Sequence, residues 1–336
     1  MPSERAAPRQ GDFATVAEPY RPELLAHCYR MLGSVHDAED LVQETYLRAW
    51  RGFDRFEGRS SVRRWLYQIA TRACLTALEA RGRRPLPSGL GAPSEDHRVA
   101  VAERDPMVPW LQPVPDTLLG APSSGDPAVV TAARAGVRLA FIAALQLLPA
   151  RQRAILTLHD VLAFTGGEIA ALLDTSPAAV DSALRRARAR LARAGPVQDD
   201  LGEPGAVDRR ALVDRYVDAF TRADPDALIQ LLRADVELEM PPVPTWFTGQ
   251  QAVTGFLSAR VMRPGRWRLL PSSANTQPAL IIHHRGGAGP WKPYGVQVLT
   301  LSGNRVARIV SFNDPGLVPA FAPAPAATEG SAHHDH

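Results

Sequence analysis

The spacing of apolar residues divides the chain into helical and strand-like stretches. Leu24, Leu25, Cys28 and Leu32 recur three or four positions apart, and helical spacing returns between residues 129 and 194. From Asp208 onward, a pair of amphipathic helices leads into alternating segments, of which "VELEM" is the clearest. The pattern therefore predicts helical units first and an α+β unit after them.

Capping signals place a helix-turn-helix in the second helical stretch. Thr165 followed three positions later by Glu168 has the spacing of a capping box, and Ser176 followed by Pro177 marks the start of another helix. Small Ala170 fits the place where the two helices cross. Two short helices joined by a tight turn are typical of this DNA-binding motif.

Breaks in the periodicity mark linkers. The stretch between the two helical units contains nine prolines, and its six acidic residues against two arginines give a net charge of −4. We interpret it as an extended acidic linker. The predicted organisation is a helical domain at 13–84, the acidic linker at 85–128, a helix-turn-helix domain at 129–194, a second linker at 195–207, an α+β domain at 208–318 and a disordered tail at 319–336.

Composition excludes several classes of protein. The 336 residues are 45% hydrophobic and 22% charged, which is typical of folded domains. Cys28 and Cys74 are too few for a disulfide framework or a zinc knuckle, and we expect no metal and no cofactor. The N-terminus lacks an apolar signal core and no apolar run reaches ~18 residues. We therefore expect a soluble, cytoplasmic protein without a membrane partner.

Arginines are concentrated on the second helix of the predicted motif. Residues 129–194 carry nine arginines against four acidic residues, and five of the nine follow Pro177. A solvated basic face is the competing interpretation, but early residues of a recognition helix contact base edges and later ones contact phosphates. The candidates for DNA contact are Ser176, Ala179, Ser182, Arg185, Arg186, Arg188 and Arg190.

The first helical unit has an acidic face and a basic, aromatic segment. Asp37, Asp40 and Glu44 fall at positions i, i+3 and i+7 and therefore share a helix face. The segment "GRSSVRRWLYQIATRACLTALEARGRR" interleaves arginines with Trp65 and Tyr67. This combination suits single-stranded nucleic acid, because aromatic rings stack on bases while arginines neutralise phosphates. Burial of Trp65 in the core is the alternative.

These residues carry a resemblance to a known family. The stretch "DAEDLVQETYLRAW…GRSSVRRWLYQIATRACLTALEARGRR" resembles region 2 of the extracytoplasmic-function (ECF) sigma factors of the sigma-70 class, and "LPARQRAILTLHDVLAFTGGEIAALLDTSPAAVDSALRRARARL" resembles region 4. The resemblance spans roughly residues 13–194. It implies a protein that binds core RNA polymerase and promoter DNA and directs promoter-specific transcription initiation.

The resemblance also implies roles for individual residues. Region 4 resembles the reader of the −35 element, which also sits on the polymerase β flap, and the linker resembles a segment that threads the polymerase near the RNA exit path. The surface that binds the clamp helices of the β′ subunit is matched by Asp37, Asp40, Gln43 and Glu44. The segment that melts and reads the −10 element is matched by Arg59, Arg63, Arg64, Arg72, Thr76, Arg81, Arg83 and Arg84.

The C-terminal part resembles the SnoaL-like polyketide-cyclase and ketosteroid-isomerase superfamily through "MPP…W…G" and "SFNDPGL". The implied fold class is multidomain: two all-α sigma domains, the second with the helix-turn-helix, and a cone-shaped α+β domain. The resemblance implies a built-in regulatory module that modulates the sigma domains. A small-molecule ligand in the cone is an open alternative, with Trp246, His283 and Arg285 as candidate pocket residues.

Enzymatic activity is not expected of this chain. Isomerases of this superfamily use a buried carboxylate opposite an oxyanion donor, and the residues show no convincing pair of this kind. The competing function is a one-component DNA-binding regulator or a cyclase-like enzyme with a DNA-binding arm. That alternative predicts tight operator binding by the protein alone.

Overall fold

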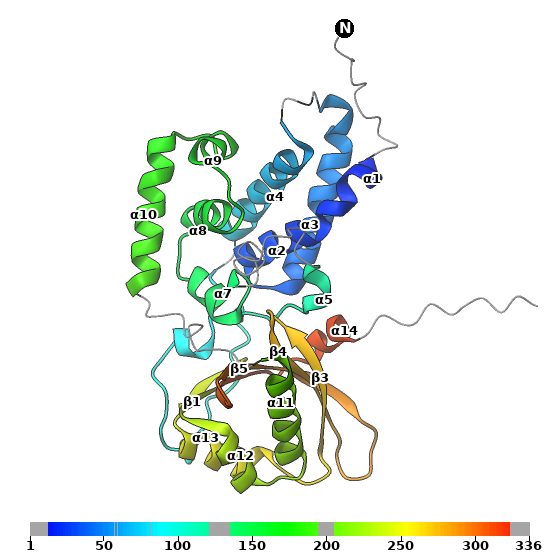
Figure 1. Cartoon of the computed structure of the whole chain (residues 1–336), viewed down its shortest axis with the longest axis vertical. Coiled ribbons are helices and arrows are strands. Elements are labelled where there is room, and N and C mark those ends of the chain that lie inside the picture. Colours follow the sequence, from blue (N-terminus) through cyan, green and yellow to red (C-terminus); the bar gives the residue numbers. More distant parts are fainter. Residues whose placement is uncertain are drawn as a thin grey trace, which may run out of the picture.

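The computed structural model describes residues 13–56, 58, 60–80, 82–120, 135–193 and 205–322. Two helical units pack against each other and rest on a domain built around a curved sheet (Figure 1). The predicted fold class, two all-α units and one α+β domain, is confirmed.

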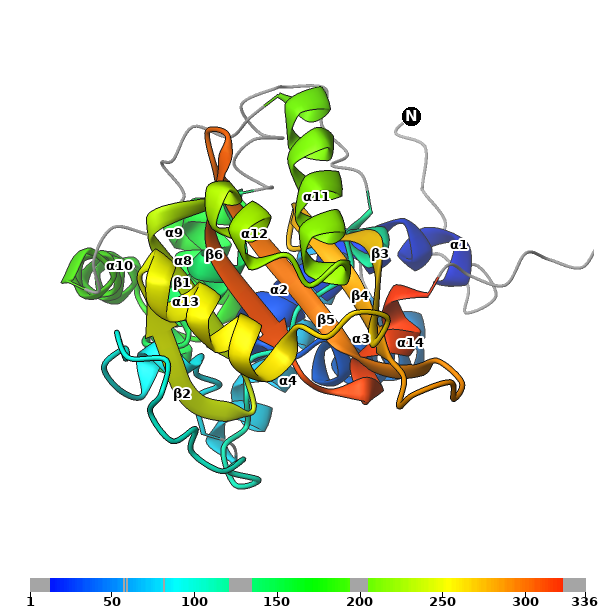
Figure 2. The ribbon, with the colours of Figure 1, turned by 90° about the horizontal axis from the view of Figure 1, so that it is seen from below.

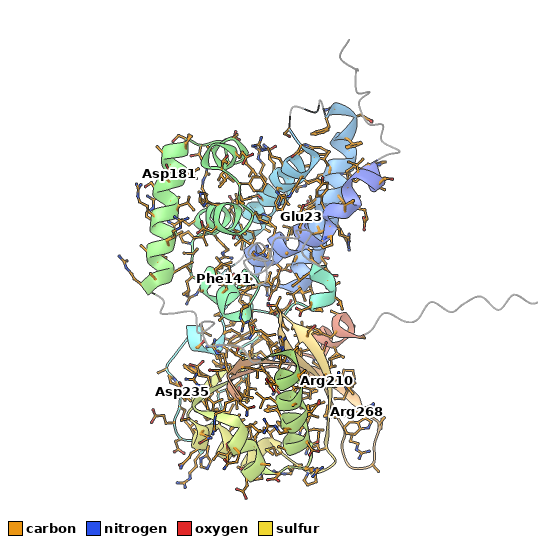
Figure 3. All side chains as sticks on the ribbon, viewed as in Figure 1. Glu23, Phe141, Asp181, Arg210, Asp235 and Arg268 are labelled. Carbon is orange, nitrogen blue, oxygen red and sulfur yellow. The ribbon has the colours of Figure 1, made fainter. Side chains whose placement is uncertain are left out.

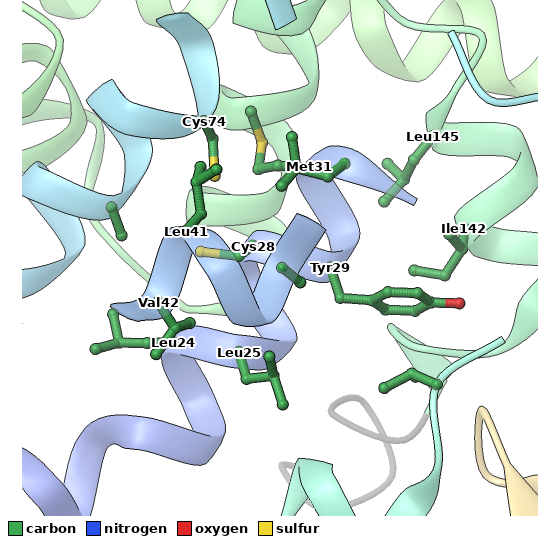
Figure 4. Close-up of a cluster of buried hydrophobic side chains, with 14 of the residues drawn as sticks. Leu24, Leu25, Cys28, Tyr29, Met31, Leu41, Val42, Cys74, Ile142 and Leu145 are labelled. Atoms are coloured by element: carbon green, nitrogen blue, oxygen red, sulfur yellow. The ribbon is translucent and has the colours of Figure 1, made fainter. Parts of the chain in front are cut away.

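The first helical unit begins at Phe13. Gly33 ends its second helix with a left-handed φ of +68°, and the Ser34 hydroxyl accepts a hydrogen bond from the Asp37 amide to start the third. Figure 4 shows Leu24, Cys28 and other buried side chains at the centre of the unit. Its helices are α1 (Phe13–Ala17), α2 (Arg21–Leu32), α3 (Val35–Gly52) and α4 (Val62–Glu79).

The second helical unit contains the predicted helix-turn-helix. Thr165 and Glu168 form the capping box expected from their spacing. Asp174, at a φ of +49°, lies in the turn, which is closed by a 2.9 Å hydrogen bond from the Thr175 amide to the Ala170 carbonyl. The helices are α7 (Leu139–Leu145), α8 (Ala150–Leu156), α9 (Gly166–Leu172) and α10 (Pro177–Arg193).

The C-terminal domain has a six-stranded sheet in the order β2-β1-β6-β5-β4-β3, antiparallel except where β1 pairs with β6. Three of its helices, α11, α12 and α13, cover one face, and the helical units lie behind the other (Figure 2). Helix α14 extends to Phe321, which is buried, although residues from 319 onward were expected to form a tail; residues 323–336 lie outside the described part of the chain.

The elements of this domain have the following bounds. The helices are α11 (Ala206–Thr221), α12 (Pro225–Leu231), α13 (Gln250–Phe256) and α14 (Val318–Phe321). The strands are β1 (Leu232–Met240), β2 (Val243–Thr248), β3 (Trp267–Ala274), β4 (Gln277–His284), β5 (Lys292–Ser302) and β6 (Arg305–Phe312).

The sequence "WFTGQQAVTGFLSARV" is divided between a strand and a helix: its first three residues belong to β2, and the helix begins at Gln250. Aromatic and β-branched residues favour a strand, and Gly249 makes the break with a φ of +90° that other residues rarely adopt.

The proline-rich linker runs across the C-terminal domain. After α4 it forms the short helix η4 (Pro87–Gly89), pairs Ser94 with Phe247 at the β2 edge of the sheet, and reaches the opposite edge, where Pro115 pairs with Ala274. It ends in α5 (Asp116–Leu119). Apolar side chains of the linker, both helical units and the outer face of the sheet belong to one continuous core.

Candidate nucleic-acid and polymerase interfaces

Helix α10 presents most of the predicted DNA-contacting residues on an exposed surface. The Ser176 hydroxyl accepts a 3.2 Å hydrogen bond from the Ala179 amide at the start of the helix. The Ser182 hydroxyl accepts a 2.6 Å hydrogen bond from Arg186, which holds that guanidinium along the helix. Figure 3 shows the outer side of α10, on which Asp181 is labelled. The exposed members of the predicted set are Ser176, Ala179, Arg185, Arg186, Arg188 and Arg190.

Arg188 differs from the other arginines of α10 because it is paired within the unit. Its Nε lies 3.1 Å from Asp160 Oδ2, and this hydrogen bond raises the pKa of Arg188. Burial acts to raise the pKa of Asp160, but the hydrogen bonds and charges of Arg188 and His159 outweigh it and lower that pKa. Arg188 therefore joins α10 to the helical turn that follows α8 (Thr157–Val161) rather than standing free for a phosphate.

Arginines of α4 face the second helical unit. Arg72 Nη2 lies 2.9 Å from Asp174 Oδ2 in the turn of the helix-turn-helix, and Arg64 pairs with Glu168 of α9. Hydrogen bonds from Thr165 are the main cause of the lowered pKa of Glu168, and Arg64 lowers it further. These pairs are substantially exposed, so each contributes at most about 1 kcal/mol to stability.

Arg63 combines an ion pair with contacts to two aromatic rings at the same junction. Its Nε lies 3.1 Å from Glu23 Oε1, and its guanidinium lies over the rings of Tyr67 and Phe164, at 5.0 and 5.4 Å from their centroids. Phe164 belongs to the second unit and packs edge-to-face on Tyr67 of the first. The basic face of α4 is thus covered in part by the helix-turn-helix.

A hollow of about 570 Å³ lies beside α3 and α4. Three arginines and two aromatic residues line it: Arg48, Arg55, Arg72, Phe56 and Trp65. Phe56 and Trp65 have ring centroids 4.9 Å apart. Guanidinium groups beside aromatic rings provide stacking surface and phosphate neutralisation together, which suits an unstacked base. The sequence analysis named Trp65 and Arg72 but not the other three residues that line this hollow, although "RAWRGFDRF" has the same arginine–aromatic composition.

The remaining candidates of the basic segment are scattered. Thr76 and Arg83 are exposed, and Arg59 and Arg81 lie outside the described residues. Arg84 Nη2 lies 2.6 Å from Asp37 Oδ2, and only about 15% of either side chain is exposed. A predicted base-reading residue and a predicted polymerase contact therefore bind each other here.

The acidic face of α3 continues into exposed apolar side chains. Asp40, Gln43 and Glu44 are exposed as predicted, and Leu47 and Trp50 follow them with exposed fractions of 56% and 46%. Exposed large apolar residues beside charged ones are typical of a protein-binding surface. Sequence spacing missed Leu47 and Trp50, because periodicity alone does not separate core positions from interface positions.

The three candidate pocket residues of the C-terminal domain do not come together. Trp246 lies on β2 and donates a 2.9 Å hydrogen bond to the Gly91 carbonyl of the linker. His283 and Arg285 lie at the end of β4, and three strands separate β4 from β2. Arg285 stacks on Trp291 at 4.5 Å, which leaves it turned toward the neighbouring loop.

Neither a metal site nor a membrane span is found within the described ranges. No group of three or more His, Cys, Asp or Glu side chains there could hold a metal ion. The helices in the same ranges are too short or too polar to cross a bilayer.

Comparison with known proteins adds family matches to this geometry. Residues 16–84 match Sigma-70 region 2, residues 138–191 match Sigma-70 region 4 and residues 213–317 match the SnoaL-like domain. The chain is 46% identical over 321 residues to the ECF RNA polymerase sigma factor SigG of Mycobacterium tuberculosis, covering 95% of this chain and 85% of that protein. The crystal structure of SigJ from the same organism shares the fold, with a TM-score of 0.59 at 23% identity over 92% of this chain and 99% of that one.

Proposed function

The chain belongs to the ECF family of RNA polymerase sigma factors, and from that premise we propose how its three parts divide the work of promoter recognition. The second helical unit contacts the −35 element through α10, and the first contacts the −10 element through α4 and the hollow beside it. The exposed face of α3, including Leu47 and Trp50, binds core polymerase. The polymerase performs the chemistry, and the chain is a transcription factor rather than an enzyme.

One observation supports a closed state that must open. Arg72 and Arg64, on the surface proposed for the −10 element, are paired with Asp174 and Glu168 of the helix-turn-helix. The two elements lie ~25 base pairs apart by their nominal positions, or ~85 Å at about 3.4 Å per base pair. Two units in direct contact do not reach both elements, so they separate before or during promoter binding.

The C-terminal domain is the element that favours the closed state. It binds the linker along both edges of its sheet and shares a core with both helical units. The linker amide of Ser88 donates a 2.8 Å hydrogen bond to the fully buried carboxylate of Glu239, which also lies 3.1 Å from Arg308. A linker held in this way is not free to follow the polymerase, so the domain modulates promoter recognition.

The test of this function is promoter binding with and without core polymerase. A gel-shift with the purified chain alone should show little binding, because the α4 surface is paired within the protein. Adding core enzyme should produce a promoter-specific complex and run-off transcription. Equal binding in both arms would favour a one-component regulator instead.

Arg185 and Arg188 should respond differently to truncation. We expect Arg185→Ala to weaken promoter binding by the holoenzyme by about 1–3 kcal/mol, since an exposed arginine early in the recognition helix is lost. Arg188→Ala should have a smaller effect on binding, because Arg188 is paired with Asp160. Titration of holoenzyme on promoter DNA at fixed salt measures both, and a larger loss from Arg188→Ala would overturn the assignment.

A further inference from the structure

We propose that the two-residue turn between β3 and β4, Asn275 and Thr276, together with Gln277 at the start of β4, is the interaction surface through which the C-terminal domain holds the two helical units and the linker together. This rests on the proposed modulating function of that domain and names the contact responsible. The hairpin of β3 and β4 points toward α5 and α7, where the helical units meet (Figure 1).

Asn275 contacts all three partners through one fully buried amide. Its Nδ2 donates to the Tyr29 hydroxyl of α2 at 2.8 Å and to the Val137 carbonyl just before α7 at 2.7 Å. Its Oδ1 accepts a 3.1 Å hydrogen bond from the linker amide of Val114, whose carbonyl accepts from the Asn275 amide at 3.0 Å. One side chain thus joins the first unit, the linker and the second unit.

The next two residues, Thr276 in the turn and Gln277 at the start of β4, extend the same contact. The Thr276 amide donates to Asp116 Oδ1 at 2.7 Å, at the start of α5. Gln277 Oε1 accepts a 3.0 Å hydrogen bond from the Leu139 amide, the first residue of α7. Amides in the first turn of a helix have no partner within it, so Gln277 supplies from another domain what a local capping residue usually supplies.

The partner surface on α2 also ties the helical units to each other. Tyr29 donates to the Gln112 carbonyl of the linker at 2.8 Å. Arg30 Nε donates to the Gly136 carbonyl of the second unit at 2.8 Å, and the Met31 carbonyl accepts from Arg153 of α8. Asn275 therefore enters the junction at the point where the two units already meet.

The conformation of the turn explains why an asparagine is suited to this position. Asn275 and Thr276 have φ values of +55° and +59°, a left-handed pair in a two-residue hairpin, where asparagine and glycine are favoured. Glycine would keep the turn, but Tyr29, Val114 and Val137 would lose their hydrogen bonds to the side-chain amide of Asn275. Burying polar groups without a partner is unfavourable, and this penalty disappears when the junction opens to water.

The experiment compares Asn275→Gly with Asn304→Gly in the full chain. Asn304 lies in the β5–β6 turn, is exposed and contacts Arg215 of the same domain at 3.0 Å, so it is a hairpin asparagine outside the junction. Small-angle scattering measures the radius of gyration, and hydrogen exchange measures protection of the Leu139 and Val114 amides. We expect Asn275→Gly to increase the radius of gyration. Exchange of both amides should be faster by about tenfold for each 1.4 kcal/mol by which the free energy of opening falls. The Asn304 variant should match the wild type.

A second variant covers the case in which Asn275→Gly destabilises the hairpin itself. Tyr29→Phe removes the partner hydroxyl from the other side of the contact and leaves the C-terminal domain untouched; it should give the same expansion, and the two changes combined should be non-additive. An unchanged radius and unchanged exchange in Tyr29→Phe, or in a folded Asn275→Gly protein, would overturn the proposal. Neither measurement uses polymerase, so a result that overturns the proposed Asn275 contact can be told apart from a failure of the core-dependent promoter-binding test.

Discussion

Cross-linking the two helical units to each other should abolish promoter-dependent transcription. Arg72→Cys and Asp174→Cys replace side chains that meet at 2.9 Å across the junction, and a short, cleavable, thiol-reactive reagent would join them. Native Cys28 and Cys74 are fully buried and should escape the reagent. The two helical units bind the promoter tightly only when both contact their elements at the same time. The cross-link prevents this, so run-off transcription should fall about 100-fold or more.

The control for this experiment is a cross-link that does not span the units. Asp218 of α11 and Arg222, the residue that follows the helix, form a comparable exposed pair at 3.0 Å, so Asp218→Cys with Arg222→Cys takes the same reagent inside one domain. Transcription by this variant should stay within a few fold of the wild type. Cleaving the reagent should return the junction variant to the activity that the same double variant shows before cross-linking. Full activity of the intact cross-link would show that the units need not separate.

Replacing Arg153 should lower the free energy of unfolding more than any other single substitution in the second unit that leaves its exposed surface unchanged. This arginine is 3% exposed; it donates to the Met31 carbonyl of α2, to Gln146 Oε1 at 2.7 Å and to the Leu148 carbonyl at 3.1 Å. Burial lowers its pKa to about 10, so the group stays charged at neutral pH. Arg153→Met leaves several buried acceptors without a donor, and we expect a loss of about 3 kcal/mol or more.

Calorimetry on the full chain measures this effect. A loss of that size should lower the Tm of the transition that includes the helical units by roughly 5–10 °C. Arg190→Met removes an exposed arginine from α10 and should leave the Tm nearly unchanged. Equal Tm values for the two variants would mean that Arg153 is not a structural centre of the junction.

The helix-turn-helix could be predicted from the sequence because its signals are local. The capping box of Thr165 and the start of α10 depend on residues within one helical turn, and both lie where spacing placed them. Pairing across the chain is not encoded in this way. The ion pair of Arg188 with Asp160 joins residues 28 positions apart, and nothing in the local pattern separates Arg188 from the other arginines of α10.

The path of the linker was equally inaccessible to sequence reasoning. Its prolines and charge indicated an extended segment, but the sheet edges that it pairs with lie far along the chain, at Phe247 and Ala274. The same limit applies to Asn275. Its local sequence indicates only a hairpin residue, and its contacts with Tyr29 and Val137 are visible only in the tertiary structure. Tertiary burial, rather than local propensity, decides these contacts.

The most direct test of the closed-to-open account is the distance between the helical units, measured by pulsed electron paramagnetic resonance. Spin labels at the exposed positions Thr15 of α1 and Ala192 of α10 report on the first and second units. The free chain should give one narrow distance distribution, and binding of core polymerase and promoter DNA should shift it outward by tens of ångströms. A transcriptionally active complex that keeps the distance distribution of the free chain would contradict the account.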